Sequence, residues 1–199
     1  MEALLKLSSG VDAVSHQIGR LIRWLVLGSV LISAGNAIIR KVFNISSNGF
    51  LEIQWYLFAG VFLLGAGFAF MRNVHVRIDF ISTKLSKRTN TIIDIAGIIV
   101  FVIPLCLIMV RLSWPLFSTA LATGEMSQNA GGLIRWPAYL LMPVGFGLLF
   151  VQALSELVKR IAFLRGLRSE PMTMEGGKSD EELLAEELAA EAAKKQSGA

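Results

Sequence analysis

The segment FLEIQWYLFAGVFLLGAGFAFM, residues 50–71, decides the fold, and Glu52 is its only charged residue. At ~1.5 Å per helical residue the segment extends about 33 Å, which is enough to cross a bilayer core of ~30 Å. Trp55 and Tyr56 lie near the Glu52 end, at the depth where amphipathic rings prefer to sit. The next segment, RNVHVRID at residues 72–79, is basic. The pattern predicts a transmembrane helix with its basic end in the cytoplasm.

The composition is typical of an integral membrane protein. Hydrophobic residues make up 54% of the chain, and its mean hydropathy is +0.60. Charged residues make up 17%, against about 25% in soluble domains. The net charge of +4 does not indicate a nucleic-acid partner, because Lys and Arg gather at the ends of apolar runs. The single cysteine, Cys106, excludes an intramolecular disulfide.

Three further apolar segments complete a transmembrane domain that is predicted at residues 22–158. Besides residues 50–71, the predicted spans are 24–39, 92–112 and 136–157. Lys and Arg number twelve in the N-terminal segment, the second loop and residues 159–168, against four in the first and third loops, where Arg111 is counted. By the positive-inside rule, both termini are expected in the cytoplasm. The predicted fold class is an all-α integral membrane protein with four transmembrane helices.

Two terminal segments lie outside this domain. Residues 1–21 carry one apolar stripe, formed by Leu4, Leu7, Val11, Val14, Ile18 and Leu21. The stripe favours an amphipathic helix along the membrane surface, with a coiled-coil contact to a partner as the alternative. Residues 159–199 are predicted to be a cytoplasmic basic stretch, a linker and an acidic tail. The segment SDEE at residues 179–182 is typical of a capping box, which predicts a solvated, partly ordered helix in the tail.

Two residues interrupt the apolar pattern of the third predicted span. Asp94 lies in its first turn, where the helix dipole favours an acid, and we expect it to pair with a loop cation rather than to couple protons or ions. Pro104 lies near the middle, where it removes a backbone hydrogen bond and is expected to kink the helix. Residues 113–135 are predicted to be a polar loop.

Glycines recur seven residues apart in the first two spans. Gly28 and Gly35 share a face of the first span, and Gly60 and Gly67 share a face of the second. Lipid solvates glycine no better than leucine, so such faces are best explained by close helix contact. They are predicted to pack within the chain or against a partner subunit.

Several kinds of chemistry are excluded by the residues present. The chain has no phosphate-binding glycine loop, which excludes ATP hydrolysis by a P-loop mechanism. His16 and His75 lie outside the predicted spans, and no Cys or His cluster occurs, so neither haem nor a metal site is expected. No predicted span carries an acid near its centre, where an antiporter needs its coupling carboxylate. We expect neither enzymatic activity nor a cofactor.

Short motifs distributed over the predicted spans form a recognisable pattern. They are EIQWYLF at 52–58, LLGAGFA at 63–69, RNVHVRID at 72–79, GE at 124–125, RWP at 135–137, PVGF at 143–146 and Gln152. Together they resemble the small permease (Q-type) subunit of TRAP transporters, the tripartite ATP-independent periplasmic transporters of bacteria and archaea. The resemblance covers roughly residues 24–159, and its most specific parts are the span that begins with an acid and the HVRID exit.

The resemblance implies a non-catalytic subunit of a Na⁺-driven importer in the bacterial inner membrane. In the family, a large permease subunit binds substrate and Na⁺ and moves them by an elevator-type motion. A periplasmic binding protein delivers the substrate, typically an organic acid. The small four-helix subunit packs beside the large one as a scaffold and offers surface to the binding protein. Membrane lipid is the remaining expected partner, and the residues that read the substrate belong to other chains.

Two other classes stay open as alternatives. A stand-alone four-helix transporter would need Glu52, Asp94 or Glu156 to be buried and to titrate. A membrane adaptor or assembly subunit of another complex is the second alternative. No catalytic, substrate-binding or metal-binding residue is predicted. The candidates for structural or subunit-contact roles are Glu52, Gln54, Arg72, His75, Arg77, Asp79, Asp94, Gly60, Gly67, Glu125, Trp136 and Gln152.

Overall fold

The protein is described by a computed structural model over residues 2–44, 47–73 and 85–168, and every named element in these ranges is helical. The elements are α1 (Glu2–Phe43), α2 (Asn48–Arg72), α4 (Lys87–Gly97), the π-helical turn η1 (Ile98–Val102), α5 (Ile103–Thr123) and α6 (Trp136–Leu164). Four described segments are long and apolar enough to cross a membrane: α1, α2, the continuous run Lys87–Thr123 and α6. For the described residues, the prediction of an all-helical fold with four such segments is confirmed.

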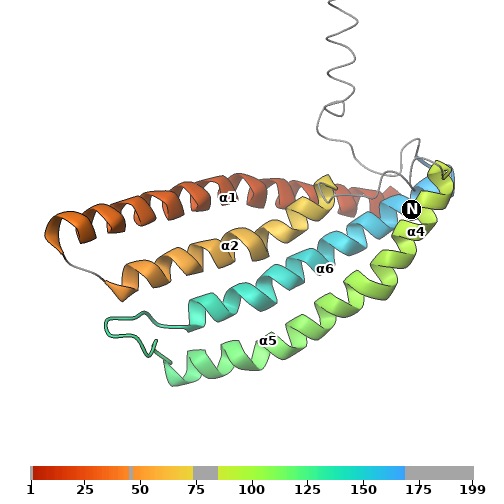
Figure 1. Ribbon diagram of the computed structural model, residues 1–199. Helices are drawn as coiled ribbons and strands as arrows, with labels where there is room; N and C mark the ends of the chain where they lie inside the picture. Colours follow the sequence, from red (N-terminus) through yellow and green to blue (C-terminus); the bar gives the residue numbers. More distant parts are fainter. Residues whose placement is uncertain (1, 45–46, 74–84, 169–199) are drawn as a thin grey trace, which may run out of the picture.

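Helix α6 lies at the centre of the bundle. Figure 1 shows α2 and α5 on either side of α6, with α1 running along the outside of α2. α1 also packs against α6, and α5 packs against α6. The buried residues of α6 occur along most of its length: Pro143, Gly145, Gln152, Ala153, Ser155, Glu156, Lys159, Arg160 and Ala162. The other long helices are therefore held together through α6.

The bundle has two distinct ends. α1 begins and α6 ends at the same one, which we call the terminal end (Figure 1). The segment 124–135, which connects α5 to α6, lies at the opposite one, which we call the hairpin end. This arrangement follows from an even number of long helices that cross the bundle in alternating directions.

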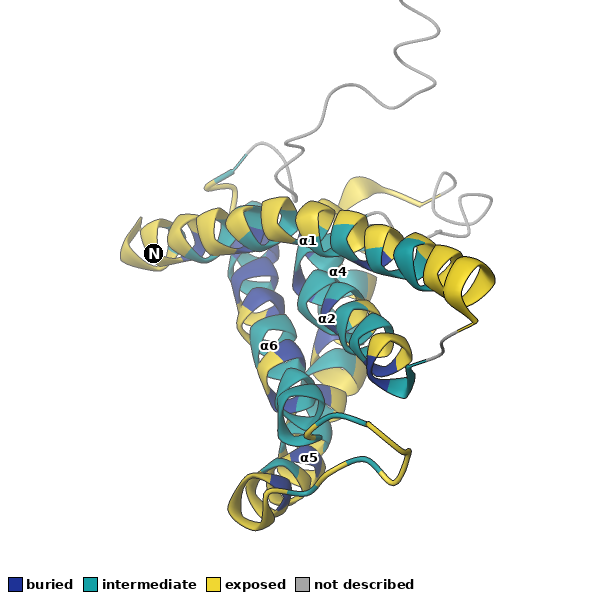
Figure 2. Ribbon diagram, turned by 90° about the vertical axis from the view of Figure 1, so that its left-hand side faces the viewer, coloured by how far each residue is buried: buried dark blue, intermediate teal, exposed yellow. Residues whose placement is uncertain are grey.

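Large apolar side chains lie on the outside of the bundle. Trp24, Phe62 and Phe101 are exposed, and Figure 2 shows exposed residues along the outer faces of the helices. The buried apolar residues are mostly small, such as Ala120 and Ala153. In water, each Å² of exposed apolar surface would cost about 25 cal/mol of hydrophobic free energy. Lipid tails solvate this surface well, so it carries no such cost in a membrane. The distribution is therefore that of a membrane protein.

Small residues of α2 permit its close contact with α1 and α6. A Cβ added to Gly60 would lie 3.5 Å from Leu25 of α1, and one added to Gly67 would lie 3.6 Å from the Leu148 carbonyl of α6. The predicted glycine face of the second span therefore packs within the chain. Among the glycines within the helices, the closest approach is at Gly145 of α6, where a Cβ would lie only 2.7 Å from Leu63 of α2.

The corresponding glycine face of α1 is open. A Cβ added to Gly28 or Gly35 would meet no described atom within 4 Å. Within the described part of the chain, this face therefore does not provide the close helix contact seen at Gly60 and Gly67.

Helix α1 is one uninterrupted helix of 42 residues, about 63 Å long at 1.5 Å per residue. We expected a boundary near residue 22, between a surface helix and a span at 24–39, and the structure has no break there. Arg20 and Arg23 suggested the boundary, but arginine is a good helix former and does not interrupt the backbone hydrogen bonds.

The N-terminal half of α1 turns its polar side toward the bundle. Ser8 and Ser15 are buried against α6, while the predicted apolar stripe is exposed at Leu4, Leu7 and Val14. The location of this stripe at a membrane surface stays a prediction.

The third long helix is longer than the predicted span of 92–112. It runs continuously from Lys87 to Thr123, so the first part of the expected loop at 113–135 is helical, and Arg111 lies inside α5 rather than in a loop. Pro115 suggested an end to the helix, yet it lies within α5. In lipid, a backbone that left the helix would lose hydrogen bonds it could not replace, and this favours continuation.

Pro104 is accommodated by a local change of helix type. The residues before it form the π-helical turn η1, and the Ile103 amide donates to the Ile98 carbonyl five residues back. Proline cannot donate to the carbonyl four residues back and crowds it, so a wider turn relieves the clash. The expected disturbance of the helix at this position therefore takes the form of a π turn.

Helix α6 begins at Trp136, and it continues past residue 157, the predicted end of the fourth span, to Leu164. The basic residues Lys159 and Arg160, expected to follow the span, are buried inside the helix. The predicted residues His75, Arg77 and Asp79, and the tail at 169–199, lie outside the described residues.

Candidate functional site

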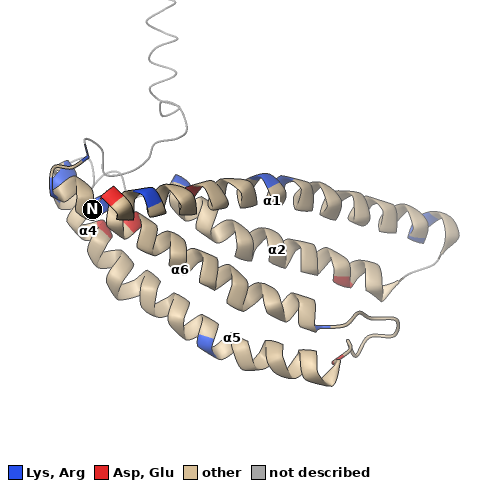
Figure 3. Cartoon of the chain, turned by 180° about the vertical axis from the view of Figure 1, so that it is seen from behind, with Lys and Arg blue, Asp and Glu red and all other residues tan. Residues whose placement is uncertain are grey.

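Polar side chains meet in two clusters, one at each end of the bundle. Figure 3 shows the acidic residues toward the two ends of the long helices. At the hairpin end, Glu52 holds the segment 124–135, and we call Glu52 with Ser127, Asn129 and Leu133 the Glu52 clamp. At the terminal end, the Lys159 network consists of Asp12, Asp94, Gln152, Ser155, Glu156, Lys159 and Arg160.

Glu52 lies in the first turns of α2 and is only 2% exposed. Its carboxylate accepts hydrogen bonds from the Ser127 hydroxyl, from Asn129 Nδ2 at 2.8 Å and from the Leu133 amide at 2.6 Å. A buried carboxylate needs such donors because burial removes its hydrating water. All three donors belong to segment 124–135, so one side chain fixes the connection between α5 and α6 onto α2.

The clamped segment is itself a small hairpin. Ser127 and Leu133 are joined by a backbone hydrogen bond of 2.9 Å, next to an isolated antiparallel bridge between Met126 and Ile134. Gly132 lies so close to Ser127 that an added Cβ would come within 2.5 Å of its Cβ. Glycine is therefore needed at this position of the hairpin.

An ion pair closes the base of the hairpin. Arg135 Nη1 lies 2.9 Å from Glu125 Oε1, and the Arg135 amide donates to the Glu125 carbonyl at 2.9 Å. The hydrogen bond that Arg135 donates to Glu125, together with Tyr139, raises the pKa of the Arg135 guanidinium. The guanidinium therefore stays charged at every physiological pH.

Two further side chains of α2 hold the hairpin. The Tyr56 hydroxyl donates to the Ile134 carbonyl at 3.0 Å, and Asn48 Nδ2 donates to the Ala130 carbonyl at 3.0 Å. A shallow hollow of about 310 Å³ remains beside them, lined by Trp55 and Tyr139 among others. The hairpin end thus presents a rigid polar surface with aromatic walls.

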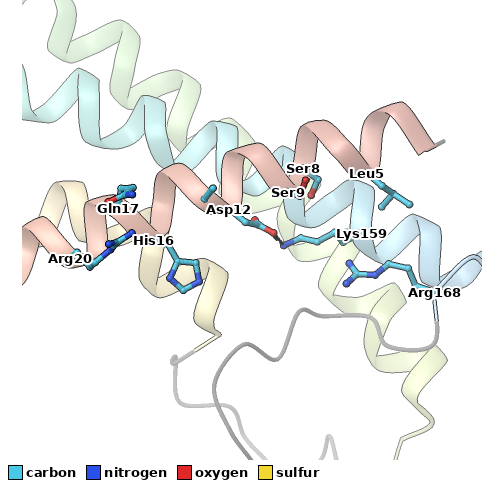
Figure 4. A pocket seen from close by; sticks show the side chains of 10 residues that line it. Leu5, Ser8, Ser9, Asp12, His16, Gln17, Arg20, Lys159 and Arg168 are labelled. Carbon is cyan, nitrogen blue, oxygen red and sulfur yellow. Dashed lines mark hydrogen bonds and ion pairs between the residues drawn. The ribbon is translucent and has the colours of Figure 1, made fainter.

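Lys159 is the centre of the cluster at the terminal end. Its ammonium lies 3.0 Å from Asp12 Oδ2 of α1 and also pairs with Glu156 one turn earlier on α6. Figure 4 shows Asp12 and Lys159 pointing toward each other from the two helices, beside a hollow of about 560 Å³. This pair ties the N-terminal half of α1 to α6.

Arg160 extends the network to the third long helix. Its Nη1 lies 2.5 Å from Glu156 Oε2, and its Nε lies 3.4 Å from Asp94 Oδ2 of α4. A loop cation is predicted for Asp94, and the structure places Arg160 of α6 beside its carboxylate. Three helices, α1, α4 and α6, thus meet in one set of ion pairs.

Neutral side chains complete the contact between α1 and α6. Ser15 donates to Gln152 Oε1 at 2.7 Å, and Gln152 Nε2 donates to Asp12 Oδ1 at 2.9 Å. The hydroxyls of Ser8 and Ser155 are hydrogen-bonded at 2.6 Å. Each buried polar atom of this contact therefore has a partner, which makes the arrangement specific as well as stable.

The buried acids are held by fixed partners. Glu156 is 1% exposed and pairs with both Lys159 and Arg160, and Glu52 accepts three hydrogen bonds. A carboxylate that coupled ions or protons across a membrane would need to exchange its partner during transport. The geometry favours structural roles for these groups.

The clusters contain some of the predicted candidates and omit others. Glu52 belongs to the clamp, and Asp94 and Gln152 belong to the Lys159 network. Glu125 pairs with Arg135 at the base of the clamped hairpin, and Trp136 begins α6. Gln54 is half-buried and joins neither cluster. Arg72 lies over the Phe68 ring, 5.4 Å from its centroid. Their roles in subunit contact stay predictions.

Sequence reasoning missed four members of the Lys159 network, Asp12, Ser155, Lys159 and Arg160, and the two serines that hydrogen-bond to it, Ser8 and Ser15. A signal was present, because Ser8, Asp12 and Ser15 share one helical face beside the apolar stripe. Glu156 likewise lies three and four residues before Lys159 and Arg160 on α6. Two polar faces on helices predicted to lie in or beside a membrane indicate mutual contact.

Residues 11–163 match the family model described as tripartite ATP-independent periplasmic transporters, DctQ component. The matched region includes every residue of the Glu52 clamp and of the Lys159 network. No curated protein and no solved structure matches the chain.

Proposed function

The chain belongs to the family of the DctQ component of tripartite ATP-independent periplasmic transporters, and we propose that it acts as the scaffold of a Na⁺-driven importer of organic acids. The family consists of transporter components rather than enzymes. In this proposal the chain packs on the large permease subunit and supplies a fixed surface against which the transporting part moves. The binding protein delivers the substrate to the assembly.

The observation that carries the scaffold role is the cross-linking of the bundle at both ends. The Glu52 clamp fixes the α5–α6 connection to α2, and the Lys159 network joins α1, α4 and α6. A stator must not deform when its neighbour moves, and buried, fully paired polar clusters favour one arrangement of the helices. The acids of the two clusters have partners suited to holding a structure rather than to releasing an ion.

The orientation is a second part of the proposal. Twelve Lys and Arg in the N-terminal segment, residues 72–90 and residues 159–168 favour a cytoplasmic terminal end. The hairpin end, with the Glu52 clamp, then faces the periplasm of a bacterial inner membrane, where the binding protein operates. The rigid hairpin offers this protein a surface of fixed shape.

Reconstitution tests the proposal. The chain is purified alone and together with the large subunit, and each preparation is placed in proteoliposomes with a Na⁺ gradient, the binding protein and a labelled organic acid. We expect uptake only with the complex and only with all three components. Uptake by the chain alone would support the stand-alone transporter and overturn the scaffold role.

A further inference from the structure

Arg111 is an exposed charged residue far from both polar clusters. It lies on α5, 17 residues after Asp94 and 14 residues before Glu125. Asp94 contacts Arg160 in the Lys159 network, and Glu125 pairs with Arg135 at the base of the hairpin. At ~1.5 Å per residue, about 26 Å and about 21 Å of helix separate Arg111 from these two levels. Its guanidinium therefore lies near the middle of the bundle's length.

The register of the other helices gives the same depth. The twenty residues that follow Glu52 on α2 end at Arg72, and this is the length that crosses a bilayer core. Leu63 lies midway along them and packs against Gly145 of α6. Gly145 lies on α6 between Arg135 and Arg160, the partners of Glu125 and Asp94, and Arg111 lies between these two acids along the chain. Arg111 therefore lies at about the same depth as the Leu63–Gly145 contact, near the middle of the membrane.

The surroundings of Arg111 on this face are apolar. Leu107, Ile108 and Trp114, one turn away along α5, are between 53% and 57% exposed. Within the described residues, Arg111 forms neither a hydrogen bond nor an ion pair. A cation at this depth is costly in hydrocarbon, because no headgroup or water compensates its charge. The face around it is therefore suited to a protein partner rather than to lipid tails.

We propose that the α5 face formed by Leu107, Ile108, Arg111 and Trp114 docks against a transmembrane helix of the large permease subunit, and that a carboxylate of this helix pairs with Arg111. The proposal rests on the function proposed above. A second copy of this chain does not fit, because its described acids lie in the two clusters or at the helix ends, away from this depth. Charge complementarity at one level would also fix the register of the two subunits.

Co-purification of the tagged chain with the large subunit tests the pairing. We expect Arg111→Leu to recover about tenfold less large subunit at an unchanged membrane level of the chain, because the partner carboxylate loses its cation. Arg111→Lys keeps the charge and should recover more than Arg111→Leu. Arg165→Leu removes an exposed cation at the terminal end and serves as the matched control, with wild-type recovery expected.

A photo-crosslinking amino acid at Ile108 identifies the occupant of the face. A crosslinked peptide of the large subunit that contains Asp or Glu supports the proposal, whereas a crosslink to lipid or to a second copy overturns it. Wild-type recovery with Arg111→Leu also overturns it and leaves the scaffold function intact. If the wild-type chain recovers no large subunit, the proposed function itself fails.

Discussion

Replacing Lys159 by Met tests whether the Lys159 network stabilises the bundle. The side chain is 3% exposed, and its loss leaves the Asp12 carboxylate without a cation, while Glu156 keeps Arg160. Removing one partner of a buried pair costs about 3–5 kcal/mol. Because the Asp12 side chain is 16% exposed and keeps its hydrogen bond from Gln152, we expect the lower limit, about 3 kcal/mol.

The only cysteine offers a direct assay. Cys106 is 0% exposed, so a thiol-reactive dye reports unfolding of the purified chain during heating. For a chain of this size, about 3 kcal/mol corresponds to a fall of about 6–12 °C in the transition temperature. The exposed Lys6 of α1 gives the control, and Lys6→Met should change the transition by less than about 2 °C.

A double variant separates the charge effect from lost packing. Asp12→Asn alone leaves Lys159 paired with Glu156 and should be mild. Adding it to Lys159→Met removes the uncompensated carboxylate and should recover at least half of the lost transition temperature. The reasoning fails if Lys159→Met unfolds like the wild-type chain, or if the double variant is no more stable than Lys159→Met.

Three further predictions address the hairpin, the helix contacts and the orientation. Glu52→Ala removes the acceptor for three donors of the hairpin, so limited trypsin digestion should cut after Arg135 faster than in the wild-type chain; an equal rate contradicts the clamp. Gly145→Ala should lower the transition temperature of the isolated chain because the new Cβ meets Leu63, whereas Gly28→Ala, with open space around it, should not; equal effects would refute the packing described for α2 and α6. A reporter fused after Arg168 should be cytoplasmic and one inserted at Gly131 periplasmic, and the opposite labelling would reverse the proposed orientation.

The number of long helices could be predicted because hydropathy depends on local sequence alone. The segment 50–71 is 22 residues long and contains a single charged residue. This length and composition identify α2 without knowledge of any neighbouring helix. The signal for the start of α6 is also local, because Trp136 and Pro137 are typical of the first turn of a helix. Each of these signals lies within one helix.

Helix ends were predicted less well because they depend on partners. Lys159 and Arg160 were assigned to the region after the fourth span, and they are buried because Asp12, Glu156 and Asp94 compensate their charges. Asp12 lies 147 residues before Lys159, and local patterns do not fix the register of two such distant helices. The need of Glu52 for a partner was predictable from its burial near a boundary. The identity of that partner, a hairpin about eighty residues later, was not.

The two polar clusters also explain how a bundle with few buried apolar side chains keeps one arrangement. In lipid, apolar contacts between helices gain little over contacts with the tails, so packing of small residues and hydrogen bonds must fix the register. Twenty residues from Trp136 end at Ser155, so Glu156, Lys159 and Arg160 lie just past the length that crosses the core. Glu52 occupies the corresponding position at the other boundary. Charges are cheapest at these two levels, and each cluster joins helices that the core alone would leave free to slide. Arg111 departs from this distribution, because it lies between the two levels. In the proposed complex, a carboxylate on a helix of the large subunit compensates its charge.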